Sequence, residues 1–171
     1  MSITVESGLW TLDGLRSSVT FRHKTMWGLL TVRGRFASFA GQGERLADGT
    51  GRGTLTIDVA SLDTKHPKRD EHLRSDDVFN ADRYPVIIFT ARRLTLQPNN
   101  KVRVDGYLTV RGESRPLSFT ARARRTGQGG IILSAELSID HADYGVTWNQ
   151  MGMLRSPATL SLNLRFVHRP G

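Results

Sequence analysis

One histidine in this sequence is placed where it could do chemistry. His23 follows Val19 and Phe21 in an alternating run, so the three side chains fall on one face of a predicted strand. An imidazole on that face can act as a general base or hydrogen-bond the polar head of a lipid. The alternative is a buried histidine that is hydrogen-bonded by its neighbours, and the sequence favours that ordinary structural role.

A second group of chemistry-bearing residues offers metal ligands. His66 and His72 flank Asp70 and Glu71. Imidazoles and carboxylates are common metal ligands, but this spacing matches no zinc signature such as His-Glu-x-x-His. A solvated helix with charge pairs explains the group better, and we predict no metal site.

Other anchors of common functional classes are missing from the sequence. It contains no cysteine, which excludes thiolate chemistry and iron–sulfur clusters. It also contains no Gly-x-Ser-x-Gly motif, phosphate loop or dinucleotide fingerprint. Arg122, Arg124 and Arg125 form the best basic stripe for nucleic acid, but no aromatic residue beside them offers a stacking platform. We therefore predict no enzyme, no catalytic residue, no required cofactor and no nucleic-acid partner.

The composition is that of a folded globular protein with a basic surface. The 171 residues fit a single domain, 1–171, and 38% of them are hydrophobic. Lys and Arg outnumber Asp and Glu by 24 to 16, and the net charge of +8 favours anionic membrane surfaces as neighbours. The sequence shows neither a signal peptide nor an 18-residue apolar run, so we expect a cytoplasmic location.

Alternation of apolar and polar residues predicts antiparallel β-strands along most of the chain. The pattern is regular in 101–110, 117–124, 131–140 and 160–168, and less regular in 19–23, 30–36 and 55–59. The apolar phase slips by one residue at Arg92-Arg93, which a β-bulge would absorb. Turn residues such as Asp48-Gly49 separate the runs. We expect about eight long strands that close into one barrel.

One segment between these strands predicts a short helix instead. Asp63 or Thr64 can cap it, with Pro67 in its first turn. The helix would lie across one end of the sheet. Arg69 and Asp70 are typical of a polar clamp that holds such a helix on the barrel.

The interior of the barrel is predicted to be apolar. Eight tilted strands enclose a lumen that side chains just fill, or that holds one small ligand. Small residues occupy several inward positions, namely Gly34, Gly106, Ala121, Ala123 and Ala135. They either leave a cavity or simply fit a tapering barrel. No charged residue of the regular C-terminal strands points inward, so a cavity would take a hydrocarbon chain.

The phases of the strands predict which residues would line the cavity and its mouth. The predicted lining is Val19, Phe21, His23, Phe36, Leu55, Ile57, Phe89, Val104, Leu108, Phe119, Ala121, Leu133, Ala135, Leu137, Leu162 and Leu164. Two stretches rich in methionine and tryptophan either adapt to a ligand at the mouth or cap the barrel end. They contribute Met26, Trp27, Trp148, Met151 and Met153.

Several short motifs follow one another along the chain. They are Ser18–His23, Gly34–Phe36, Asp63-Thr64, Arg69–Leu73, Phe79, Tyr84-Pro85 and Phe89. Each motif is weak alone, but the ordered set resembles the YceI-like family, and the likeness extends from Leu9 to Phe166.

The resemblance implies a lipocalin-like antiparallel β-barrel that holds a long isoprenoid, such as a polyprenyl chain or an isoprenoid quinone, or another amphiphile. With the strand count, the expected fold is all-β, an extended eight-stranded barrel with a short helix between strands. Many family members are exported behind a signal peptide, which this sequence does not show, and members are often dimers.

We therefore expect a cytoplasmic protein that carries or sequesters a long-chain isoprenoid or similar amphiphilic lipid, contacts anionic membranes transiently and can form a homodimer. One alternative is an enzyme that acts on a lipid-like substrate with His23 as base. The other is a structural barrel with no ligand.

Overall fold

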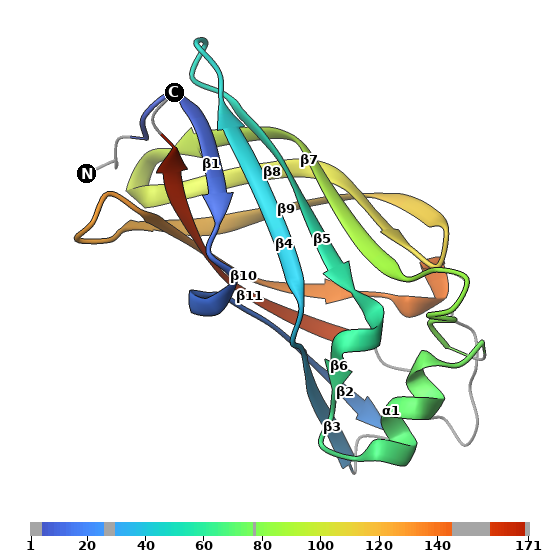
Figure 1. The fold of residues 1–171 in the computed structure, drawn as a ribbon. Coiled ribbons are helices and arrows are strands. Elements are labelled where there is room, and N and C mark those ends of the chain that lie inside the picture. The colour runs from blue at the N-terminus through green and yellow to red at the C-terminus, as the bar shows by residue number, and fades with distance from the viewer. Residues whose placement is uncertain (1–4, 26–29, 77, 145–157, 170–171) are drawn as a thin grey trace.

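Eight antiparallel strands close into a barrel in the computed structural model of the chain (Figure 1). The structure describes residues 5–25, 30–76, 78–144 and 158–169. The barrel strands are, in spatial order, β1 (Gly8–Leu12), β4 (Phe39–Arg45), β5 (Gly51–Asp58), β7 (Val86–Gln97), β8 (Lys101–Val110), β9 (Glu113–Arg125), β10 (Ile131–Ile139) and β11 (Ala158–Arg169). β11 pairs with β1 and so closes the ring. The predicted extended, lipocalin-like eight-stranded barrel is confirmed.

Three further strands extend the sheet beyond the ring. They are β2 (Ser18–Thr25), β3 (Leu30–Phe36) and β6 (Leu62–Asp63). β2 pairs with the first half of β11, β3 with β2, and β6 with the end of β3. Two short 3-10 turns, η1 (Gly14–Arg16) and η3 (Val59–Ser61), separate β1 from β2 and β5 from β6. The irregular alternation of the N-terminal half therefore reflects strands that are interrupted and continue at a new angle.

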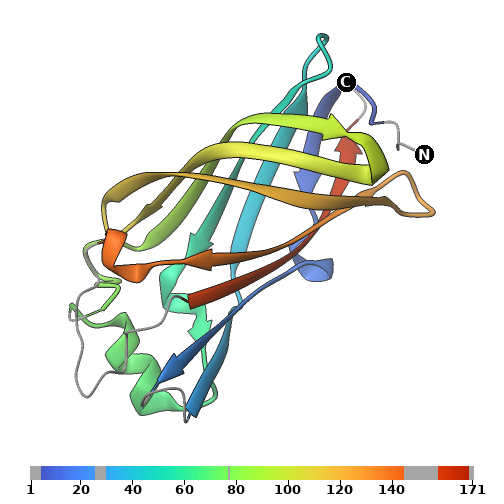
Figure 2. The same ribbon diagram turned by 180° about the vertical axis from the view of Figure 1, so that it is seen from behind.

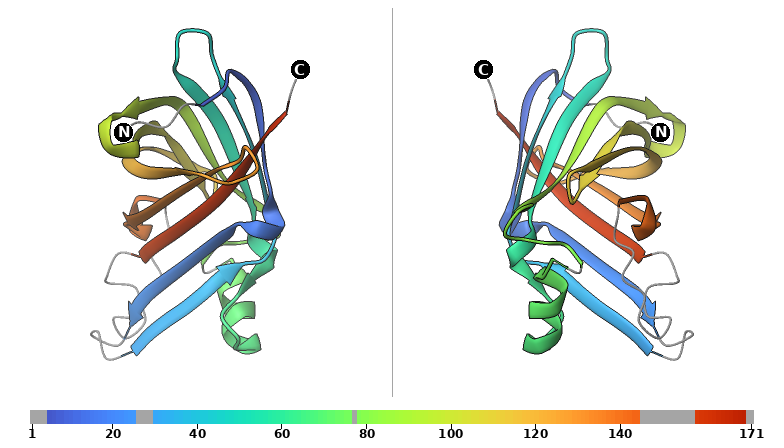
Figure 3. Two further views of the ribbon diagram at one scale, coloured as in Figure 1. Left: turned by 90° about the vertical axis from the view of Figure 1, so that its left-hand side faces the viewer. Right: turned by 90° about the vertical axis from the view of Figure 1, so that its right-hand side faces the viewer.

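The two ends of the molecule are built differently. Figure 3 shows the β4–β5 hairpin projecting at one end, with β2 and β3 reaching the opposite end. The hairpin turn contains the predicted Asp48-Gly49 pair, and Gly49 has a φ of +92°, a conformation that favours glycine. β1 begins and β11 ends beside this hairpin, at what we call the mouth end.

The helix α1 (Pro67–Arg74) lies at the opposite end, close to β6 (Figure 2). Asp70 is only 7% exposed, and its carboxylate accepts hydrogen bonds from the amide and the hydroxyl of Thr64. Arg69 donates from Nε to the Thr64 hydroxyl at 2.8 Å and from Nη2 to the Thr64 carbonyl at 2.9 Å. The predicted polar clamp is confirmed.

The cap of α1 differs from the expectation. His66 is the N-cap, and its Nδ1 accepts a hydrogen bond from the Arg69 amide at 3.2 Å. Pro67 explains the shift, because proline occupies the first helical position and places the cap on the residue before it. The Asp63 carboxylate instead accepts a hydrogen bond from the Lys65 amide, in the turn before the helix. Thr64 hydrogen-bonds to Asp70 as part of the polar clamp.

Inward side chains form two apolar clusters, one at each end of the barrel. The cluster near α1 is densely filled by large side chains and includes Val19, Phe36, Leu55, Ile57, Val59, Leu62, Ile87 and Leu108. The cluster at the mouth end has fewer and smaller members, namely Trp10, Ala91, Val102, Val104, Ala121, Ala123 and Ile131. Phe89 packs against both clusters and marks the boundary between them.

The predicted β-bulge is present in β7, where the register with β8 shifts between Ala91 and Arg93. Gly106 lies opposite Ala91, and a Cβ at Gly106 would stand 2.1 Å from the Thr90 carbonyl oxygen and 3.0 Å from Phe89 Cζ. The close approach of these two strands therefore requires glycine at this position.

At Gly34 the structure decides between the two alternatives left open for the small inward residues, and it shows close packing. A Cβ at Gly34 would stand 2.4 Å from Phe21 Cζ and 2.8 Å from Thr64 Cγ2. The space that the missing side chain leaves is filled by the Phe21 ring, so this glycine permits packing instead of creating a void.

We expect Gly106→Ala to lower the free energy of unfolding by about 1–3 kcal/mol or more, because the added methyl group meets a carbonyl that the sheet holds in place. Urea unfolding followed by circular dichroism measures the loss. Gly127→Ala is the matched control, since a Cβ at Gly127 has no neighbour within 4 Å. Equal stability of the two variants would contradict the close contact.

Candidate ligand-binding cavity

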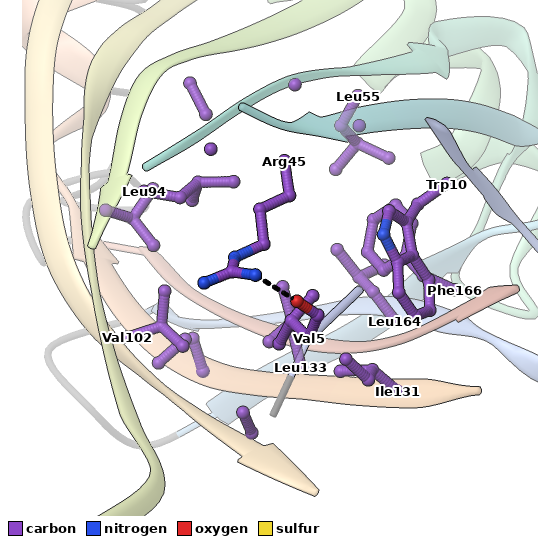
Figure 4. Close-up of a pocket in the computed structure, with 18 of the residues that line it drawn as sticks. Val5, Trp10, Arg45, Leu55, Leu94, Val102, Ile131, Leu133, Leu164 and Phe166 are labelled. Atoms are coloured by element: carbon purple, nitrogen blue, oxygen red, sulfur yellow. Dashed lines mark hydrogen bonds between the residues drawn. The ribbon is translucent and has the colours of Figure 1, made fainter. Parts of the chain in front are cut away.

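A cavity of about 170 Å³ occupies the mouth end of the barrel (Figure 4). All eight barrel strands contribute to its wall, which is almost wholly apolar. An apolar cavity of comparable size, ~150 Å³, stays dry and binds benzene in another protein. The geometry therefore suits a hydrocarbon group, as the sequence predicts.

Small residues at one level of the barrel create this space. Gly43 of β4 pairs with Gly53 of β5, and Gly53 pairs with Ala91 of β7, so three neighbouring strands on the cavity wall lack large side chains along one row. We call these three residues the small-residue row. A Cβ at Gly43 would have a single neighbour within 4 Å, the Arg52 carbonyl oxygen at 3.5 Å. Space is therefore open on the inner side of Gly43.

Two phenylalanines pack against each other on the cavity wall. The rings of Phe89 and Phe119 lie with their centroids 5.6 Å apart and tilted by 46°. Both rings line the cavity, and Phe89 also contacts the filled cluster beyond it. Phe89 therefore connects the open part of the barrel with the packed part.

Nine of the sixteen predicted lining residues stand on the cavity wall. They are Leu55, Phe89, Val104, Phe119, Ala121, Leu133, Ala135, Leu162 and Leu164. These residues come from six different strands, which the fold brings to a common level. As ligand contacts they stay predictions.

The other seven lie outside this cavity, namely Val19, Phe21, His23, Phe36, Ile57, Leu108 and Leu137. Most belong to the filled cluster near α1 or pack against it. The alternation of a strand tells which residues face inward, but not how far along the barrel axis they stand. Met26, Trp27, Trp148, Met151 and Met153, predicted at the mouth, lie outside the described residues.

The histidines that the sequence singles out, His23, His66 and His72, do not line the cavity. His23 is 8% exposed and stands in β2 opposite Val32, beyond the ring of eight strands. This agrees with the structural role that the sequence favours for it. His66 caps α1, and the part of the chain that the structure describes holds no group of three or more metal-ligating side chains.

A cationic side chain, Arg45, enters the cavity although the sequence analysis does not name it. Figure 4 shows its guanidinium among apolar side chains that include Leu94 and Trp10. Nη1 donates a hydrogen bond to the Val5 carbonyl, whereas Nε is buried and has no hydrogen-bond partner. A buried donor without a partner costs about 1–3 kcal/mol, and more if it is charged.

The sequence carries only a weak indication that Arg45 faces the interior of the barrel. Phe39, Gly41, Gly43 and Arg45 alternate along β4 and lead into the Asp48-Gly49 turn. Glycines contribute no apolar character, so the alternation is not visible to a hydrophobicity pattern. The other residues that the analysis leaves out of the wall include Val5, Trp10, Gly51, Gly53, Leu94, Leu96, Val102 and Phe166.

The first described residues cross the mouth end. Val5 packs on the cavity cluster, and the Glu6 carboxylate pairs with Arg125 of β9 at 3.1 Å. The Trp10 indole donates to the Glu6 carbonyl at 3.0 Å. A backbone hydrogen bond at Glu6 itself and then the Arg125 guanidinium lower the pKa of the Glu6 carboxyl. The contact between this segment and β9 is thus an ion pair at neutral pH.

None of the described helices is long and apolar enough to cross a membrane.

A barrel with one packed end and an apolar cavity at the other is the architecture of small-ligand-binding β-barrels. The chain belongs to the YceI-like domain family, whose model matches residues 10–166. Both the predicted fold and the predicted family are confirmed.

Curated relatives have similar sequences. A UPF0312 protein of Staphylococcus aureus (strain N315) is 32% identical over 151 residues, which cover 82% of this chain and 84% of that protein. A UPF0312 protein of Vibrio campbellii is 30% identical over 112 residues, or 63% of this chain and 58% of that protein. The match thus spans less than two thirds of the length of the Vibrio relative.

Solved structures share the fold. BcnA of Burkholderia cenocepacia superposes with a TM-score of 0.81 at 23% identity, covering 90% of this chain and 98% of that one. A polyisoprenoid binding domain from Saccharophagus degradans superposes with a TM-score of 0.75 at 18% identity, covering 96% and 100%. At these identities the likeness establishes the fold.

Proposed function

We propose that this protein binds and carries a long-chain isoprenoid, such as a polyprenyl chain or an isoprenoid quinone, or a similar amphiphilic lipid. The apolar cavity walled by all eight strands carries the proposal. Membership of the YceI-like family and the fold shared with a polyisoprenoid binding domain support it.

Burial of the tail is the proposed source of affinity. Each buried methylene contributes about 0.8 kcal/mol, so some ten such groups contribute about 8 kcal/mol, and a long tail needs more of them to offset the costs of association. The cavity of about 170 Å³ encloses only a segment near the size of benzene. A longer tail therefore needs apolar surface beyond this cavity.

The geometry favours binding over catalysis. An enzyme with His23 as base would require this imidazole beside the substrate, whereas His23 is buried in β2 and is not among the residues of the cavity wall. The proposal is therefore a carrier or sequestering protein that needs no cofactor for its activity.

Organic extraction of the purified protein, followed by mass spectrometry, tests the proposal. Native mass spectrometry of the same sample counts bound molecules. We expect one prenyl or acyl lipid per chain. An empty protein that also takes up no long-chain isoprenoid added in detergent would overturn the proposal in favour of a structural barrel.

We expect Gly43→Leu to weaken isoprenoid binding by at least about tenfold, because the leucine side chain fills space that several tail carbons would occupy. Ala40→Leu is the matched control, since Ala40 is exposed on the same strand. Titration of each variant with geranylgeraniol measures the dissociation constants. Unchanged binding by Gly43→Leu would place the tail elsewhere.

The net charge of +8 is proposed to speed the capture of lipid from anionic membranes. One charge near such a surface contributes about 1 kcal/mol, which is small beside the burial of a whole tail. We expect high salt to slow transfer from phosphatidylglycerol vesicles, with little change in the fraction of protein loaded at equilibrium. Stopped-flow transfer of a fluorescent isoprenoid measures both quantities, and a rate that does not respond to salt would contradict contact with the membrane.

A further inference from the structure

The inward position of Arg45 is fixed by the barrel. Arg45 pairs with Gly51 of β5 and Gly8 of β1, so glycines flank it on both sides. The long side chain therefore meets no neighbouring side chain across the strands and extends into the cavity (Figure 4). A Cβ at Gly49 would stand 3.6 Å from Arg45 Nη2, which places the guanidinium beneath the β4–β5 turn at the mouth end.

The hydrogen-bonding capacity of this guanidinium is largely unused. Arginine has five N–H donors, and the described residues offer Arg45 one acceptor, the Val5 carbonyl. Its Nε is buried without a partner. No ion pair between described residues includes Arg45. Buried polar atoms are ordinarily hydrogen-bonded, so the buried Nε of Arg45 points to an acceptor that is brought in from outside.

The nearby carboxylates are directed elsewhere. Glu44 precedes Arg45 but pairs with Arg52 at 2.9 Å, on the exposed side of the sheet. Glu6 pairs with Arg125 at 3.1 Å. Neither carboxylate pairs with the Arg45 guanidinium.

We infer that Arg45 binds the anionic oxygen head group of an amphiphile, a carboxylate or a phosphate, whose tail occupies the cavity. This inference rests on the proposed function and adds to it the chemical class of the head group and the direction of the ligand. The head lies at the mouth end beneath the β4–β5 turn, and the tail points towards Phe89 and Phe119.

The chemistry of the guanidinium explains why arginine suits this task. Its planar fork matches carboxylate and phosphate oxygens, and it is less strongly hydrated than an ammonium group. In an apolar wall a charge-assisted hydrogen bond is also stronger than in water. A neutral alcohol would satisfy the same donors less well, so the side chain discriminates between lipids with identical tails.

Calorimetric titration of the full chain with matched probes tests this inference. One pair is geranylgeranyl phosphate and geranylgeraniol, and the other is palmitate and hexadecanol. Each pair shares a tail and differs in the head, and the two pairs distinguish a prenyl phosphate from a fatty acid as the source of the anion. The variants are Arg45→Met, Arg45→Lys and, as a control, Arg52→Met, which removes an exposed arginine of the adjacent strand.

We expect the natural chain to prefer the anionic member of at least one pair by about tenfold or more, since charge-assisted hydrogen bonds are roughly twice as strong as neutral ones. Arg45→Met should reduce this ratio to about one, Arg45→Lys should retain part of it, and Arg52→Met should leave it unchanged. A thermal melt of each variant verifies that it is folded.

Two outcomes would overturn the role of Arg45 while leaving lipid binding intact. One is equal affinity of the natural chain for both members of each pair. The other is an equal loss for anionic and neutral probes in Arg45→Met, which would make Arg45 an anchor for Val5 alone. Failure of the natural chain to bind any of the four probes would instead contradict the proposed function itself.

Discussion

The hollow half of the barrel depends on one constraint, the lack of large side chains along the small-residue row. Gly43, Gly53 and Ala91 oppose one another across three strands. Backbone hydrogen bonds hold those strands at the normal sheet spacing whatever side chains they carry. The wall therefore cannot move inward to fill the space, as a helical core can. The cavity results from regular strand pairing and not from poor packing.

The densely packed end of the barrel supplies the apolar burial, and so the stability, that the end with the cavity lacks. An unfilled core loses dispersion contacts and transfer free energy. Val19, Ile57 and Leu62 at the other end are at most 2% exposed, and the clamp between Arg69, Asp70 and Thr64 holds α1 over them. Dense packing and open space thus occupy different parts of the same strands, and Phe89 contacts both.

The sequence predicts the fold well because the C-terminal strands alternate regularly. The run 101–110 coincides with β8, the run 131–140 matches β10 to within one residue, and the phase slip at Arg92-Arg93 coincides with the bulge in β7. The family motifs lead to the same barrel. Strand phase succeeds here because it depends only on local periodicity, which each segment carries in itself.

The site is less predictable, because it depends on levels along the barrel axis. Leu55 and Ile57 share a face of β5, yet only Leu55 reaches the cavity. That difference follows from strand tilt and register, which are properties of the closed barrel. Arg45 is not predicted as a wall residue for another reason. The inward positions just before it in β4 are glycines, which show no alternation of apolar and polar residues. Both errors arise where the pairing of distant strands, and not local pattern, decides what a residue contacts.

The pairing of the first barrel strand with the last has a consequence for how the chain acquires its structure. β1 joins β11 through partners as distant as Leu9 and Arg169. During synthesis β1 has to wait for β11, the last of the eight barrel strands to be made. Until then both strand edges and the apolar inner faces are exposed to other chains. Ring closure is therefore a late and slow event, dominated by contacts between distant residues.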